Sequence, residues 1–278
     1  MKLKELYHKA ILTGIDNDPR GREIVQKDLE AKKKEFDSLK EDEREFFDRE
    51  ALDNPYSDSR ILNGTGEEEV RNILVGIDIE VSEVLLCDRL RGKGTEIDLV
   101  MAHHPGGKAY ANLYDVMHIQ ADILYRFGVP INIAEDLMDS RIKEVARKLM
   151  PVNHARAVDA ARLLSLPFIC LHTPSDNMVA TYLQRLFDEK KPSSVGDIMD
   201  IIKEIPEYRE AAYNGAGPMI LIGSKTRKAG RIFVDMTGGT EGSKEIFSSI
   251  APKKNSQKLN AFNLGKATSR APICNGTR

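Results

Sequence analysis

The chain has 278 residues, of which 41% are hydrophobic and 30% are charged, which is enough for one large core or two smaller ones. Its 41 basic and 43 acidic residues are interspersed along most of the chain and leave a net charge of −2, so no wide basic face favours a nucleic-acid partner. No run approaches the roughly 18 apolar residues of a membrane span, and the N-terminus lacks the apolar core of a signal peptide, so we expect a cytoplasmic protein with no membrane partner.

Residues 1–52 are predicted to form a helical N-terminal layer. Apolar residues recur at helical spacing over residues 2–13, and Gly14 then favours a helix end. Residues 20–50 are rich in charged helix formers with apolar positions between them, which is typical of a solvated helix. An interaction arm is the alternative. Turn formers from Asp53 to Arg60 indicate a linker, which we extend over residues 53–69.

Short apolar runs alternate with helical patterns from residue 70 to residue 250. The pattern predicts strands at 73–77, 97–102, 131–134 and 168–171, and helices at 81–90, 112–127, 140–149 and 154–164. We therefore expect an α/β domain with a layered mixed sheet and flanking helices. Apolar runs at 219–222 and 231–234 predict a β-hairpin, and residues 243–250 predict a further helix.

The composition changes abruptly after Ile250. Residues 251–278 contain six Lys or Arg and no Asp or Glu, whereas the preceding residues carry all 43 acids. Apolar periodicity is also missing, so the pattern predicts an irregular or disordered tail.

Two adjacent histidines stand where a buried strand is predicted to end. His103 and His104 are followed by Pro105 and two glycines, which permit the bend that would turn both rings toward one cleft. Neutral imidazole nitrogens suit zinc, iron, nickel and copper. The alternative is a turn that carries two partly exposed histidines.

A second predicted strand end has the same character. The strand at 168–171 leads to His172 and, after a proline turn, to Asp176. Asp176 could complete a metal site or could cap the helix that follows. Because parallel strands end at one edge of a sheet, we expect His103, His104 and Asp176 to converge and to bind a divalent metal ion, zinc or iron.

The pair of motifs His103-His104-Pro105 and His172-Thr173-Pro174-Ser175-Asp176 resembles the Nif-three-like family of dinuclear metal-centre proteins, often labelled GTP cyclohydrolase I type 2-like. The resemblance implies an α/β fold, a toroidal homohexamer and a two-metal site. It also implies that His103, His104 and Asp176 are metal ligands and that His172 is a neighbour of the site.

The family label implies a metal-dependent hydrolase that acts on a small anionic or nucleotide substrate or another phosphoester. The alternative is a non-enzymatic hexameric scaffold or metal-handling interaction protein. Thr237-Gly238-Gly239-Thr240 resembles a phosphate-binding loop only in composition.

The sequence departs from the family pattern in two ways. The part between His104 and Asp176 is long, with extra helical sequence around His118 and His154, which indicates a divergent branch. The family's last ligands are expected in a C-terminal Gly-His segment followed by an acid, but no histidine follows His172. We therefore predict a truncation or frame shift after about Ile250, and a site that binds metal weakly or binds one ion.

Overall fold

The computed structural model describes residues 1–240 and the backbone of residues 262–263. The predicted helix at 243–250 and nearly all of the predicted tail lie outside these residues, as does the proposed truncation. None of the helices in the described ranges is both long and apolar enough to cross a bilayer.

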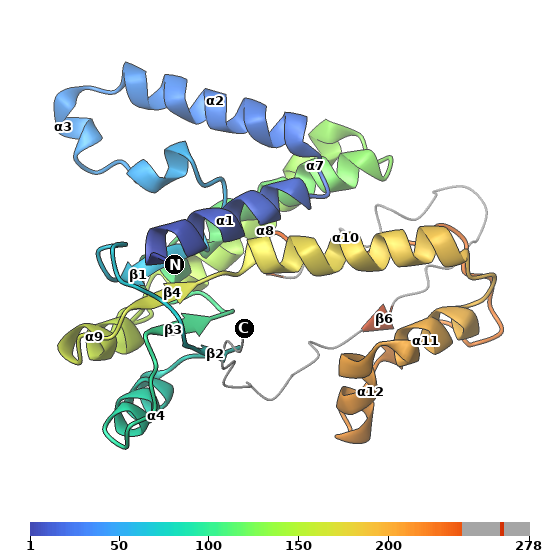
Figure 1. Ribbon diagram of the computed structural model, residues 1–278. Coiled ribbons are helices and arrows are strands. Elements are labelled where there is room, and N and C mark those ends of the chain that lie inside the picture. Colours follow the sequence, from blue (N-terminus) through green and yellow to red (C-terminus); the bar gives the residue numbers. More distant parts are fainter. Residues whose placement is uncertain (241–261, 264–278) are drawn as a thin grey trace.

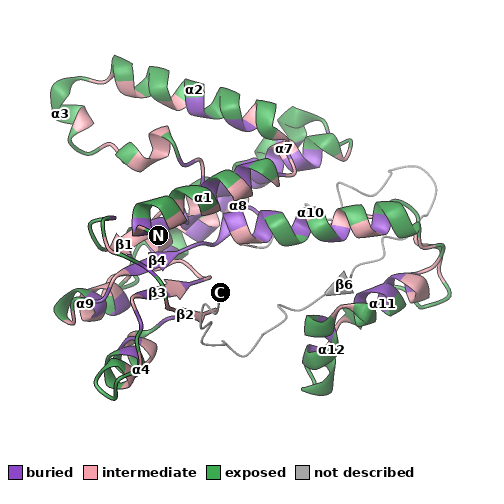
Figure 2. Ribbon diagram, in the orientation of Figure 1, coloured by how far each residue is buried: buried purple, intermediate pink, exposed green. Residues whose placement is uncertain are grey.

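The N-terminal layer is helical, as predicted. It consists of α1 (Leu3–Asp16), α2 (Arg22–Ser38), α3 (Glu41–Arg44) and the 3-10 helix η1 (Arg49–Leu52). Figure 2 shows that α2 is mostly exposed, with Val25 and Leu29 as its buried residues. This pattern fits a solvated helix that contacts the body along a narrow stripe.

A mixed four-stranded sheet lies between helices and confirms the predicted α/β class (Figure 1). Its strands lie in the order β1-β4-β3-β2, and their bounds are β1 (Arg60–Asn63), β2 (Ile73–Gly76), β3 (Leu99–Ala102) and β4 (Phe168–Cys170). β2, β3 and β4 are parallel, whereas β1 pairs with β4 in the antiparallel direction. β1 lies inside the segment 53–69 that was expected to be a linker, so that segment contributes an edge strand.

Both faces of the sheet are covered by helices. Leu99 and Ile169 belong to a core that includes residues of α1 and α2, whereas Val100 and Phe168 belong to a core that includes residues of α4 (Val81–Arg91) and α9 (Arg156–Leu163). Successive residues of one strand thus face opposite layers, as strand geometry requires. The predicted layered arrangement is confirmed.

The remaining helices follow the strands and extend the body. They are α5 (Gly107–Ala111), α6 (Leu113–Val116), α7 (Ile119–Arg126), α8 (Ile131–Leu149), α10 (Thr173–Lys190), α11 (Val195–Glu204) and α12 (Pro206–Tyr213). α10 lies beside α1 (Figure 1), and Gly14 allows close approach because a Cβ there would lie 2.6 Å from Pro174 Cβ. This contact sets the position of the first turn of α10.

Two predicted strands are wrong. Residues 131–134 form the first turn of α8 after Pro130, because the buried residues Ala134, Met138 and Ile142 continue at helical spacing. The predicted hairpin is also absent from the described residues. β5 (Met219–Ile220) pairs with β6 (Phe262–Asn263), and residues 231–234 form no strand.

Candidate metal centre

The carboxyl ends of β3 and β4 place three histidines at one edge of the sheet. The backbone amides of His103 and His104 donate to the carbonyls of Gly76 and Ile77, at 2.9 and 2.8 Å. The strand pairing therefore continues past β3 before Pro105 and Gly107, whose φ is +52°, turn the chain into α5. His172 lies between β4 and α10 and is the N-cap residue of α10.

The three imidazoles converge. One ring nitrogen from each of His103, His104 and His172 lies within 4.8 Å of the others. The ring centroid of His103 lies 5.1 Å from that of His104 and 4.8 Å from that of His172. The side chain of His172 is 5% exposed, whereas that of His104 is 33% exposed. The cluster therefore runs from the protein interior to the surface.

Asp176 adds a carboxylate to this cluster. It lies in the first turns of α10, and its Oδ1 and Oδ2 lie 3.4 Å from His103 Nε2 and 3.6 Å from His172 Nε2. Asp176 is the fourth residue of α10, whose N-cap residue is His172, so Asp176 does not occupy the capping position considered from the sequence. The structure brings His103, His104 and Asp176 together and adds His172 to them.

A buried carboxylate, Asp58, orients His172. Asp58 Oδ2 accepts hydrogen bonds from His172 Nδ1 at 2.8 Å and from Thr173 Oγ1 at 2.6 Å. Burial alone would raise the pKa of Asp58, but the hydrogen bond and charge of His172, with hydrogen bonds from Thr173 and Ser59, lower that pKa below its ordinary value. Asp58 is therefore ionised at neutral pH, and the Nε2 of His172 is the ring nitrogen on the side of Asp176.

A second carboxylate, Asp78, contacts His104 in the same way. Asp78 Oδ1 lies 2.5 Å from His104 Nδ1. A carboxylate on one ring nitrogen fixes the tautomer and ring orientation and leaves the other nitrogen to bind a metal ion. Three imidazoles and one carboxylate form a donor set that suits zinc or iron, so the residues present fit a metal ion.

Asp58 and Asp78 are not among the site residues predicted from the sequence. Asp78 follows β2 at the same sheet edge, so the rule that functional groups gather beyond strand ends could have identified it. Asp58 gave no such signal, because its neighbours are turn formers that indicated a linker.

The other candidates lie outside the cluster. His118 is exposed, and the His154 ring packs against Tyr110 at 5.4 Å. The loop from Thr237 to Thr240 packs against the body, since Thr237 Oγ1 donates to Asn177 Oδ1 at 2.5 Å and Gln120 Nε2 donates to the Gly238 carbonyl. Gly238 and Gly239 lie against α6 and α7, where a Cβ would clash.

No protein-family model and no curated protein matches this sequence. Among solved structures, the chain is similar to the crystal structure of a NIF3 superfamily protein from Sphaerobacter thermophilus. The TM-score is 0.60 and the sequence identity is 27%, over 69% of this chain and 69% of that chain.

Proposed function

We propose that this chain, whose fold is similar to that of a NIF3 superfamily protein, binds a divalent metal ion through His103, His104 and Asp176. The observation that carries the proposal is their convergence with His172 at one sheet edge, with Asp176 Oδ1 3.4 Å from His103 Nε2. The nitrogen-rich donor set favours zinc or iron over magnesium or calcium, which prefer oxygen ligands.

His172 has two roles open to it. Its Nδ1 is held by Asp58, so its Nε2 is oriented either to join the three ligands or to position Asp176. With these residues the site has enough donors for one tetrahedral ion. One ion per chain is accordingly the stoichiometry that we propose.

The chemistry that fits this site is metal-assisted hydrolysis. A bound divalent ion lowers the pKa of a water molecule and polarises a phosphoester or a ring carbon. The exposed side of the cluster, at His104, would admit a small anionic or nucleotide substrate. Asp78 keeps the His104 ring in one orientation there.

A non-enzymatic homohexameric scaffold is the second candidate, and exposed apolar side chains favour it. Met178, Val179 and Tyr182 of α10 are 46%, 38% and 54% exposed, and they lie next to Asp176 along the helix. Large exposed apolar side chains that gather on one element are typical of interaction surfaces. Self-association through this face of α10 would bury these side chains in an oligomer.

The proposal is tested by measuring metal content and solution mass together. Wild-type protein should hold one zinc or iron ion per chain, and His104→Ala should weaken the affinity about tenfold or more. The exposed His118→Ala is the matched control and should keep wild-type affinity. Retention of the full metal content in His104→Ala would contradict the proposed site, and two tightly held ions per chain would contradict the one-ion stoichiometry.

Turnover assays separate the two candidates. Metal-dependent hydrolysis of a nucleotide or phosphoester that is lost in His104→Ala and kept in His118→Ala would support the enzyme. A hexameric mass without turnover across the panel would support the scaffold.

A further inference from the structure

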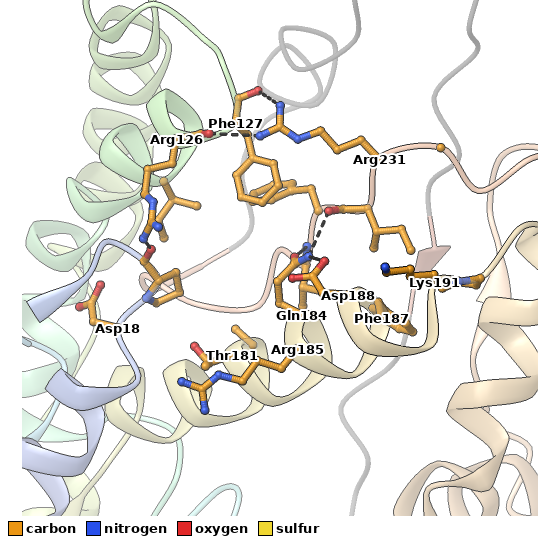
Figure 3. A pocket seen from close by; sticks show the side chains of 18 residues that line it. Asp18, Arg126, Phe127, Thr181, Gln184, Arg185, Phe187, Asp188, Lys191 and Arg231 are labelled. Atoms are coloured by element: carbon orange, nitrogen blue, oxygen red, sulfur yellow. Dashed lines mark hydrogen bonds between the residues drawn. The ribbon is translucent and has the colours of Figure 1, made fainter.

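A cavity of about 780 Å³ lies between α7, α10 and the segment 230–234 (Figure 3). Small-molecule sites usually have volumes of roughly 300–1,000 Å³, so this cavity has the size of a ligand site. Its residues on α10 run from Ala180 to Asp188, beyond Asp176 along the helix. None of the proposed metal ligands lines it.

Cationic side chains outnumber the acids in the cavity wall. The cations are Arg126, Arg185, Lys191 and Arg231, and the acids are Asp18 and Asp188. Asp18 is fully buried and accepts hydrogen bonds from Arg20 and from the Tyr56 hydroxyl, so its charge is already compensated. Asp188 accepts a hydrogen bond from Gln184 Nε2 at 3.1 Å.

Two of the four cations are held in place by backbone carbonyls. Arg231 donates to the carbonyls of Phe127 and Arg126, at 2.9 and 3.2 Å, and its guanidinium lies 4.7 Å from the centre of the Phe127 ring. Arg126 donates to the Pro19 carbonyl. These contacts fix the two guanidinium groups at the rim of the cavity, and no acid among the described residues compensates their positive charge.

The other two cations have no such contacts. Within the described part of the chain, the charged groups of Arg185 and Lys191 make no hydrogen bond or ion pair. Lys191 ends α10 in a left-handed conformation, with a φ of 46°. Both side chains are exposed at the cavity and are available to an anion.

An aromatic pair forms the apolar part of the wall. The rings of Phe127 and Phe233 lie 4.3 Å apart at an angle of 58°, and Ile123 and Phe187 lie in the same wall. A ligand that matches this cavity has an anionic group for the cations and a flat apolar part for the aromatic pair.

We infer that this cavity binds a phosphate ester with an aromatic group, separately from the metal centre. The cationic side chains of the wall bind the phosphate, and the apolar part of the ligand packs on Phe127 and Phe233. The site is independent of the proposed hydrolysis, because its residues are not those of the histidine cluster.

Phenyl phosphate is the probe, and calorimetric titration of the full chain is the measurement. The wild type should show saturable binding that is tighter than its binding of inorganic phosphate or phenol alone. Arg185→Gln/Lys191→Gln should weaken binding about tenfold or more, because two charged donors are lost. Arg89→Gln/Lys93→Gln, which removes the same charge at the exposed end of α4, should leave binding unchanged.

A second experiment distinguishes binding in this cavity from binding at the metal centre. Binding should persist in His104→Ala and after treatment with a chelator. The inference is overturned if the wild type shows no saturable binding, if both double variants lose affinity equally, or if binding disappears with the metal.

Discussion

Replacing the buried Asp58 by asparagine tests whether one carboxylate supports both the fold and the metal centre. Asp58 Oδ2 accepts from His172 Nδ1 and Thr173 Oγ1, and its Oδ1 accepts from Ser59 Oγ at 3.2 Å. An asparagine has one acceptor oxygen. If that oxygen keeps the contacts with His172 Nδ1 and Thr173 Oγ1, the amide NH2 group faces two donors, Ser59 Oγ and the backbone N–H of Thr173.

The expected magnitude follows from these contacts. Hydrogen bonds to a charged group contribute about 1.5–3 kcal/mol each, and a buried donor without an acceptor costs about 1–3 kcal/mol. The neutral amide regains part of this through its smaller desolvation cost. We expect Asp58→Asn to lower the free energy of unfolding by about 2–4 kcal/mol, and to weaken metal affinity about 10–100-fold because a neutral amide holds the His172 ring less strongly than a carboxylate does.

Urea unfolding and metal titration measure the two effects in the same protein. The control is Asp139→Asn, which removes a carboxylate from an exposed i,i+4 pair with Lys143 and should change stability by less than about 1 kcal/mol. The reasoning is refuted if Asp58→Asn is as stable as the Asp139→Asn control. Wild-type metal affinity in a folded Asp58→Asn protein would refute the orienting role alone.

Two further predictions concern acid and the contact between α1 and α10. Because the folded pKa of Asp58 lies below its ordinary 3.8, its stabilisation is complete above that value and is lost as the pH falls through the lowered pKa. The urea unfolding midpoints of wild type and Asp58→Asn should therefore approach each other as the pH is lowered below 3.8. A difference between the two midpoints that stays constant with pH would contradict this prediction. Gly14→Ala should destabilise the protein by about 1–3 kcal/mol through overpacking, because its Cβ would lie 2.6 Å from Pro174 Cβ. Gly92→Ala, whose nearest neighbours lie at 3.5 and 3.6 Å, is the control in thermal unfolding and should be neutral or slightly stabilising.

Local sequence patterns were sufficient to predict the strands that are buried on both faces of the sheet. β2, β3 and β4 are short apolar runs between turn formers, and the sequence predicted all three within a few residues. They could be predicted because a parallel strand is covered on both faces, so most of its residues are apolar. The strand predicted at residues 131–134 was wrong, since a short apolar run fits a strand and the start of a helix equally well.

Strand pairings between segments that are far apart in the sequence could not be predicted from local patterns. β5 pairs with β6, which lies in the segment predicted to be an irregular tail. β1 was hidden among turn formers and became a strand because β4 offers it an open edge. Strand formation depends strongly on such tertiary context.

The candidate site was likewise predicted only in part. Local sequence determined that His103 and His104 end one strand and that His172 and Asp176 follow another, and parallel strand ends share one edge. The tertiary structure alone decided the rest, because Asp58 reaches His172 across 114 residues through the antiparallel pairing of β1 with β4. Neighbours that are far apart along the chain meet only when the sheet assembles, so the spacing of residues gives no sign that Asp58 orients the His172 imidazole.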